Sequence, residues 1–169
     1  MRNLDISNNE ITDKSIKALN ELFEDNKTVI NLNVLDLKKN KIGDDGVQLL
    51  ANLLIHNKDK ILCIKSLNLD SNKFYCQGAF GIAKIINENL NIETLTISSN
   101  FIKSDGIAKI FRALTINKKL KSIDLSKNLY EKNKSYYFLD SLPIVKINEL
   151  VLSGIKSFKY DDYLNFFHG

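Results

Sequence analysis

The chain repeats one pattern of apolar residues and a single asparagine along most of its length. The pattern is Leu-x-x-Leu-x-Leu-x-x-Asn-x-Ile, and its asparagines are Asn9, Asn40, Asn72, Asn100 and Asn128. Consecutive asparagines are 31, 32, 28 and 28 residues apart. A sixth copy begins at Ile147 but lacks the asparagine. A nearly fixed period of this length indicates a solenoid, in which each unit buries its apolar face only by stacking on its neighbours.

Each copy of the pattern has two halves with different apolar spacing. In the first half apolar and polar residues alternate, as around Leu35 and Leu37, which is typical of a β-strand. In the second half apolar residues fall at helical intervals, as at Val47, Leu50 and Leu54, which predicts a helix buried along one stripe. We expect parallel strands near residues 3–6, 34–37, 66–69, 94–97, 122–125 and 149–152. We expect helices near residues 14–25, 45–56, 77–88 and 105–116.

Polar residues and glycines return at fixed places in the repeat. The asparagine after each strand is expected to bond to backbone groups where the chain turns off the sheet. Side chains that would cap the start of their own helix are Asp13, Asp44 and Ser104, with Cys76 at the same position in repeat three. Residues suited to left-handed geometry at the helix ends are Asn26, Asn57, Asn89 and Asn117. Glycines that we interpret as packing residues of the first helical turn are Gly46, Gly78 and Gly106.

The strand pattern, followed by Gly46-Val47-x-x-Leu50-Ala51-x-x-Leu54, resembles the repeat of ribonuclease-inhibitor-like leucine-rich-repeat proteins. That family includes ribonuclease inhibitor, the Ran GTPase-activating protein, nucleotide-binding innate receptors and tropomodulin-like actin-capping proteins. The resemblance covers about residues 1–152. It implies an α/β fold, a leucine-rich-repeat solenoid shaped as a right-handed horseshoe arc, with a parallel sheet on the concave face and helices on the convex face. It also implies binding to another protein without identifying that protein.

The length and the repeats describe one domain over residues 1–169, with about five repeats and a sixth strand. Residues 153–169 are rich in aromatic side chains and leave the repeat pattern, so we expect them to cap the C-terminal end of the core. No comparable cap precedes the first strand, so either upstream sequence is missing or another element covers that edge. Pro143 predicts that the fifth helix, near residues 134–141, is short or irregular.

Composition narrows the classes of function. All but two of the 24 basic residues are lysines and the net charge is only +4, which disfavours nucleic acid as a partner. Cys63 and Cys76 are too far apart for a zinc ribbon or a redox motif, and His56 and His168 stand alone. We therefore expect no metal site, no cofactor and no catalytic residue. The sequence has no apolar leader and no membrane span, which predicts a cytoplasmic protein, with delivery by a specialised secretion route left open.

Strand residues that do not enter the core should face the concave side of the sheet in columns. We take the candidate partner-binding residues from these columns, namely Asp5, Asp36, Lys38, Asn68, Asp70, Thr96 and Asp124. Their carboxylates would attract a basic surface. The columns hold no Tyr, Trp or Arg, the residues that dominate interface hot spots, so an ordinary solvated sheet face is the alternative. The rival site is the aromatic C-terminal segment with Phe158, Tyr160, Tyr163, Phe166 and Phe167.

These features predict a non-enzymatic scaffold or adaptor that binds a protein partner through its repeat surface, and a pathogen effector is one form of such a protein. Neither nucleic acid nor a membrane is an expected partner. The alternative is a regulator of an enzyme, such as a small-GTPase activator of the Ran-activator type. That alternative needs catalytic loop residues, and no position of this sequence can be matched to them. The partner's identity and the oligomeric state stay open.

Overall fold

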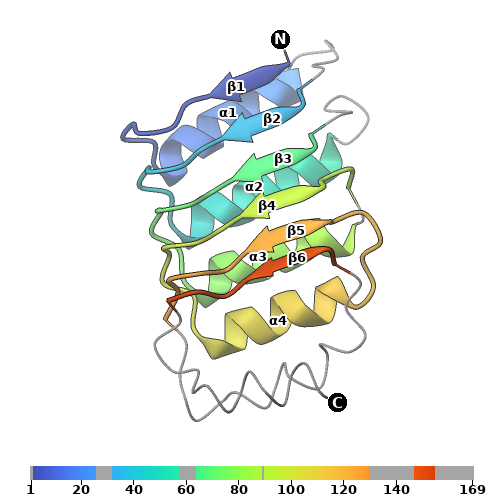
Figure 1. Ribbon diagram of the computed structural model, residues 1–169. Helices are drawn as coiled ribbons and strands as arrows, with labels where there is room; N and C mark the ends of the chain where they lie inside the picture. Colours follow the sequence, from blue (N-terminus) through green and yellow to red (C-terminus); the bar gives the residue numbers. More distant parts are fainter. Residues whose placement is uncertain (1, 26–31, 58–63, 89, 130–146, 155–169) are drawn as a thin grey trace, which may run out of the picture.

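The computed structural model describes residues 2–25, 32–57, 64–88, 90–129 and 147–154, with only the backbone for residues 22–25. Strands and helices alternate along these residues (Figure 1). The strands are β1 (Asn3–Asp5), β2 (Val34–Asp36), β3 (Ser66–Asn68), β4 (Thr94–Thr96), β5 (Ser122–Asp124) and β6 (Glu149–Val151). The helices are α1 (Asp13–Asp25), α2 (Asp44–His56), α3 (Cys76–Asn87) and α4 (Ser104–Leu114). The predicted strands and these four helices are confirmed, and each helix begins one residue earlier than expected.

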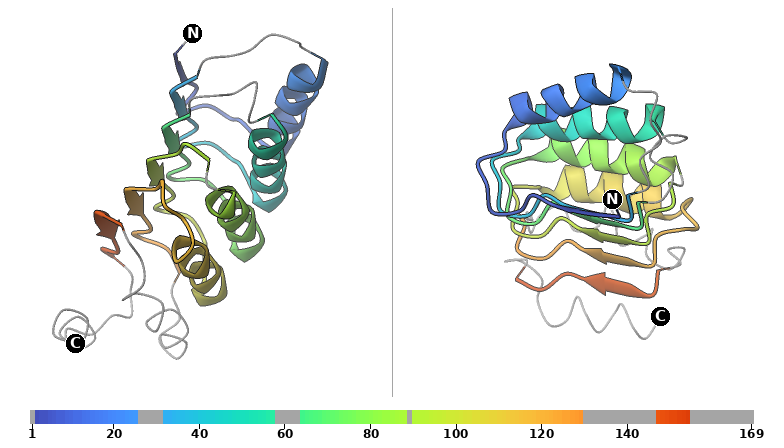
Figure 2. Two further views of the ribbon diagram at one scale, coloured as in Figure 1. Left: turned by 90° about the vertical axis from the view of Figure 1, so that its right-hand side faces the viewer. Right: turned by 90° about the horizontal axis from the view of Figure 1, so that it is seen from above.

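The strands form one parallel sheet in the order β1-β2-β3-β4-β5-β6. Each strand pairs in register with the next, so equivalent residues of successive repeats lie side by side in columns. Figure 2 shows the sheet on the inner side of a shallow arc and the helices on its outer side. In the part of the chain that the structure describes, no helix lies against the inner face of the sheet. The predicted solenoid, with its concave sheet and convex helices, is confirmed.

The core fills the space between the sheet and the helices. The middle residue of each inner strand is buried, as Leu67 and Leu95 are, and so is the apolar residue two positions later, as Leu69 and Ile97 are. One stripe of each helix completes this core, and the buried Phe111 is among its largest side chains. Helices α2 and α3 therefore pack against each other and against the sheet, because no single repeat encloses its own apolar residues.

The carboxylates that begin α1 and α2 bond to the following repeat and not to their own helix. The Gly43 N–H donates to Asp13 Oδ1 at 2.7 Å. Asp44 Oδ1 accepts the N–H of Tyr75 at 2.8 Å and that of Gly78 at 2.6 Å. The prediction that these residues cap their own helices was wrong, because the stacked neighbour places unpaired amide groups closer. Each of these carboxylates links one repeat to the next.

The same contacts explain the glycines in the first helical turn. A Cβ at Gly78 would lie 2.9 Å from Asp44 Oδ1 and 2.7 Å from the Phe74 Cβ. A Cβ at Gly46 would collide with the Asp13 carboxylate in the same way. These are distances that real side chains do not adopt, so the interpretation as packing glycines is confirmed.

Left-handed backbone geometry occurs at a different place from the one expected. Asn57 at the end of α2 has φ −107° and ψ 23°, so the left-handed prediction was wrong there, and Asn117 is not left-handed either. Positive φ values occur instead at the residue before each ladder asparagine, namely Asn8, Lys39, Ser71, Ser99 and Lys127. This residue turns the chain off the sheet. Asn26, Asn89, the helix expected near 134–141 and all but two residues of the expected cap at 153–169 lie outside the described residues.

Candidate functional site

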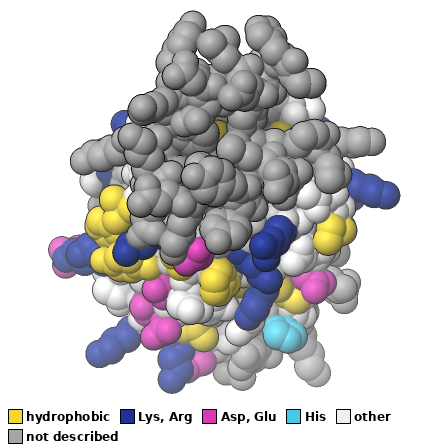
Figure 3. Space-filling model, turned by 90° about the horizontal axis from the view of Figure 1, so that it is seen from below, with side chains coloured by type: hydrophobic (Ala, Val, Ile, Leu, Met, Phe, Trp, Pro, Cys, Tyr) yellow, Lys and Arg dark blue, Asp and Glu magenta, His cyan; other side chains and the backbone are white. Residues whose placement is uncertain are grey.

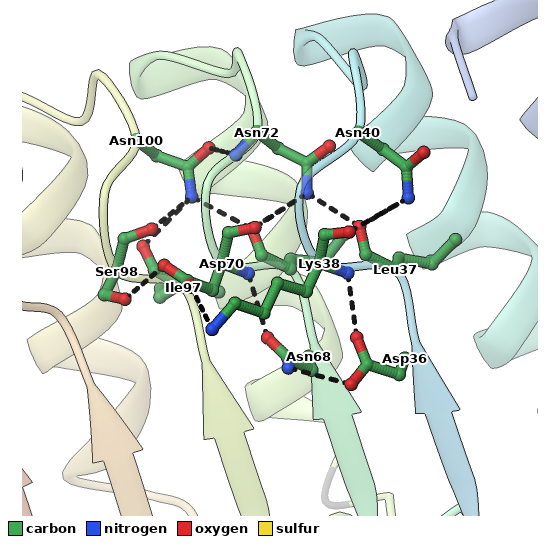
Figure 4. Close-up of polar contacts among 11 residues, drawn as sticks. Asp36, Leu37, Lys38, Asn40, Asn68, Asp70, Asn72, Ile97, Ser98 and Asn100 are labelled. Carbon is green, nitrogen blue, oxygen red and sulfur yellow. Dashed lines mark hydrogen bonds and ion pairs between the residues drawn. The ribbon is translucent and has the colours of Figure 1, made fainter. Parts of the chain in front are cut away.

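The repeated asparagines form a ladder along the edge where the strands end. Asn72 is only 4% exposed, and its Oδ1 accepts the Ile42 N–H at 3.1 Å. Its Nδ2 donates at 3.0, 3.1 and 3.3 Å to the carbonyl oxygens of Leu37, Leu69 and Asp70. Figure 4 shows the neighbouring rungs, Asn40 and Asn100. From Asn40 onward each ladder asparagine joins its own strand end to the preceding repeat, which confirms the structural role predicted for the ladder.

A second row of polar side chains closes a local turn at the ends of β1, β2, β3 and β5. Oδ1 accepts the N–H two residues later at Asp5 (2.9 Å), Asp36 (2.9 Å), Asn68 (3.0 Å) and Asp124 (2.8 Å). Such side-chain turns are an alternative to the sheet hydrogen bonds that end here. Asn68 Nδ2 also donates to Asp36 Oδ2 at 3.1 Å (Figure 4). The carboxylates that we predicted to meet a partner therefore also have a structural role.

Lys38 and Asp70 form an ion pair on the same face of the sheet. Lys38 Nζ lies 2.9 Å from Asp70 Oδ2, and the Ser98 hydroxyl donates to Asp70 Oδ1 (Figure 4). Burial works to raise the pKa of Asp70, but hydrogen bonds from Ser98 and Lys38 and the lysine charge outweigh it, so this pKa is lowered. The hydrogen bond to Asp70, followed by the Asp70 charge, raises the pKa of Lys38. Asp70 is thus buried and neutralised, and it orients Lys38.

The structure places the predicted partner-binding residues together on the concave face. One column of the sheet contains Asp5, Asp36, Asn68, Thr96 and Asp124. Asp5 is exposed and the rest of this column is half-buried. Lys38 and Asp70 follow at the strand ends, where Lys38 is half-buried. Carboxylates of neighbouring strands meet only at Asp5 and Asp36, because Asn68 and Thr96 separate Asp36 from Asp124.

Sequence reasoning missed a group of exposed apolar side chains on the loops between the strands and the helices. We call Tyr75, Phe101 and Leu129 the apolar edge patch. They are 49%, 38% and 42% exposed, respectively. The rings of Tyr75 and Phe101 are stacked, with centroids 5.1 Å apart and planes at 22°. The signal was present in the repeat, because the position after the ladder asparagine is charged in repeats one to three and apolar in repeats four and five.

Two further residues that sequence analysis singled out, Cys76 and His56, lie within the described part of the chain. Cys76 is a free cysteine, and His56 Nδ1 lies 2.8 Å from the carbonyl oxygen of Asn52 in its own helix. Among the described residues, no three His, Cys, Asp or Glu side chains are grouped so that they could hold a metal ion. None of the described helices is both long enough and apolar enough to span a membrane. Cys63, His168 and the aromatic segment from Phe158 to Phe167 lie outside the described residues.

Comparison with known proteins agrees with this architecture. The family described as Leucine Rich repeat matches residues 1–19 and 30–51. This chain is a leucine-rich-repeat solenoid. It is similar to the leucine-rich repeat-containing protein AAC1 of Dictyostelium discoideum, with 34% identity over 135 residues that span 79% of this chain and 16% of the relative.

Two further relatives are similar to this chain at lower identity. The NACHT, LRR and PYD domains-containing protein 13 of Homo sapiens is 28% identical over 66% of this chain and 10% of its own length. FERM domain-containing protein C of Dictyostelium discoideum is 27% identical over 82% of this chain and 9% of its own length. The solenoid thus aligns with between 9% and 16% of the length of these relatives.

Proposed function

We propose that this solenoid binds a protein partner and that its concave sheet face makes the contact. The observation that carries the proposal is the open inner face of the sheet, which no helix covers among the described residues (Figure 2). Leucine-rich-repeat domains generally act as scaffolds for protein interaction, and the curvature of a solenoid creates an extended binding surface. The proposal assigns the domain a binding role and not a catalytic one.

The charges on this face support a basic partner surface. Asp5 and Asp36 lie on paired strands, about 4.8 Å apart in the hydrogen-bonding direction, so their fields add within one Debye length. Hydrogen bonding to Ser7 lowers the pKa of Asp5, which keeps this exposed carboxylate charged. Lys38 and Asp70 neutralise each other. The three acids of the column, Asp5, Asp36 and Asp124, therefore give the field that a partner meets a negative sign.

The repeat subtype belongs to the same proposal. The 28-residue spacing from Asn72 to Asn100 and from Asn100 to Asn128 supports a ribonuclease-inhibitor-like repeat. So does the regular helix that follows each of the strands β1 to β4, with 13, 13, 12 and 11 residues.

The test neutralises the concave acids without breaking the turns that they close. Asp36→Asn with Asp124→Asn keeps an Oδ1 acceptor at both sites, and Asn68 already performs this role in repeat three. We expect the double variant to associate more slowly with a partner captured from cell lysate, and its rate to depend less on salt. The matched control is Asp45→Asn with Glu88→Gln, which removes two exposed charges outside the concave columns. Equal association rates for wild type and the concave variant at low salt would contradict the proposal.

The competing site at the C-terminal aromatic segment predicts the opposite pattern. A partner bound there through apolar burial would associate with little salt dependence, and Tyr163→Ala would weaken it. Our proposal expects Tyr163→Ala to leave the association rate unchanged.

A further inference from the structure

One solvent-facing column of the solenoid changes its chemistry part-way along the chain. The residue after the ladder asparagine is exposed in every repeat, and its members are Glu10, Lys41, Lys73, Phe101 and Leu129. In the first two repeats this position holds an ion pair, with Lys41 Nζ 2.7 Å from Glu10 Oε1. Because the position faces solvent whatever residue occupies it, the fold does not require an apolar side chain there. Phe101 and Leu129 therefore depart from the repeat without any gain in core packing.

The loops that carry the apolar edge patch are held side by side. The Phe101 N–H donates to the Phe74 carbonyl oxygen at 3.0 Å, and the Leu129 N–H donates to the Ile102 carbonyl oxygen at 2.9 Å. These bonds place Phe101 between Tyr75 on one loop and Leu129 on the next. Figure 3 shows hydrophobic side chains gathered at this edge, on the left of the view, with lysine or arginine side chains and some Asp or Glu side chains beside them.

Three lysines lie on the loops that carry the apolar edge patch. Lys73 occupies the same repeat position as Phe101 one repeat earlier, and Lys127 lies two residues before Leu129. Lys103 occupies the same repeat position as Tyr75 one repeat later. All three lysines are exposed, and they outnumber the nearby exposed carboxylate of Asp105, in the first turn of α4. A ligand that buries the rings therefore meets ammonium groups around them.

We propose that the apolar edge patch binds a short segment of a partner protein in which apolar side chains are flanked by Asp or Glu. The inference rests on the proposed protein-binding function but uses a surface other than the concave face. Exposed aromatic side chains form interface hot spots because they bury a large area at a small cost in side-chain entropy. The stack of Tyr75 on Phe101 holds both rings in place before the ligand arrives. The lysines then select acidic neighbours and increase the association rate.

The experiment uses a random dodecapeptide library displayed on phage and selected on the immobilised full chain. The disrupting variant is Phe101→Lys with Leu129→Lys, which gives repeats four and five the residue that Lys41 and Lys73 supply at this position. It should therefore fold as the wild type does, and far-UV circular dichroism checks this. The matched control is Ile116→Lys, which changes a 62% exposed apolar residue after the end of α4.

We expect selected peptides to share apolar anchors flanked by Asp or Glu. Synthetic versions should bind wild type and Ile116→Lys equally and bind the disrupting variant at least about tenfold more weakly by titration calorimetry. Lys73→Ser should weaken them less and reduce the salt dependence. The proposal is overturned if no peptide family is enriched, if enriched peptides lack acidic residues, or if they bind the disrupting variant as tightly as wild type.

Three further outcomes would also overturn the proposal, two by identifying another occupant of the patch and one by assigning the peptides to the concave face. If the wild type sediments as a dimer and the disrupting variant as a monomer, the patch binds a second copy of the chain. If a single-stranded oligouridine competes with the peptides, the stacked rings and lysines serve nucleic acid. Peptides that lose binding to Asp36→Asn with Asp124→Asn, but not to the disrupting variant, would support the concave site and reject only the edge site.

Discussion

Replacing Asn72 with alanine should be among the most destabilising single changes in this chain. Asn72 makes its hydrogen bonds from a position only 4% exposed, and they reach two repeats. Its removal leaves the Ile42 N–H without its acceptor. The carbonyl oxygens of Leu37 and Leu69 each lose one bond but keep the one that they accept from Asn40 Nδ2 and Asn100 Nδ2, respectively. An unsatisfied buried polar group costs about 1–3 kcal/mol, so we expect Asn72→Ala to lower the free energy of unfolding by about 2 kcal/mol.

Two matched variants calibrate this value. Asn9→Ala removes the same side chain from the first rung, which is exposed and donates only to Ile6 and Ser7, so water replaces the lost bonds and the cost should stay below about 1 kcal/mol. Asn68→Ala should cost about 1 kcal/mol, which is more than the about 0.5 kcal/mol that bounds most surface substitutions. The structure shows why, because Asn68 closes a turn and contacts Asp36.

Urea unfolding followed by far-UV circular dichroism measures all three variants, with the slope against denaturant checked for constancy. The expected order of loss is Asn72, then Asn68, then Asn9. Equal losses for Asn72→Ala and Asn9→Ala would refute the reasoning, because they would show that the buried bonds to the preceding repeat contribute nothing beyond the local turn.

The remaining predictions concern the contacts between repeats. Gly46→Ala should lower the free energy of unfolding by about 1–3 kcal/mol, because the new Cβ collides with the Asp13 carboxylate. In a double-mutant cycle measured by calorimetric unfolding, adding Asp13→Ala should recover part of this loss. Asp70 contributes stability that is present above its unfolded pKa, about 3.9, and is lost as the pH falls through its lowered folded pKa. The stability difference between wild type and Asp70→Asn should therefore be constant from about pH 7 to pH 5 and shrink towards about pH 2; a difference that grows on acidification contradicts the assigned ion pair.

The strands, the helices and the asparagine ladder could be predicted because the same positions are buried in every repeat and therefore carry the same types of residue. Leu67 and Leu95 are apolar since they lie in the core, and Asn72 recurs since every repeat has the same backbone groups to satisfy. The direction of contacts between repeats could not be predicted in this way. The position of Asp44 in its own helix suggests a local cap, and only the stacked neighbour shows that its carboxylate bonds to Tyr75 and Gly78.

The candidate site was harder to predict, because one repeated residue can serve fold and function together. Asp36 and Asp124 lie in a polar column that the sequence pattern assigns to the open face of the sheet. The structure shows that each of them also closes a turn. Left-handed geometry at Lys39 and Lys127 has no signal in residue type and depends on the repeat position alone. The apolar edge patch could have been found from sequence, because Phe101 breaks a column that is otherwise charged up to Lys73.

The most direct test of the central claim is quantitative affinity capture with four baits compared by mass spectrometry. The baits are wild type, Ile116→Lys, Asp36→Asn with Asp124→Asn, and Phe101→Lys with Leu129→Lys. A solenoid that binds a protein through these surfaces should enrich the same partner with wild type and Ile116→Lys and lose it with at least one of the two surface variants. Enrichment of no protein above an unrelated solenoid bait, or of one protein equally by all four baits, would contradict the claim.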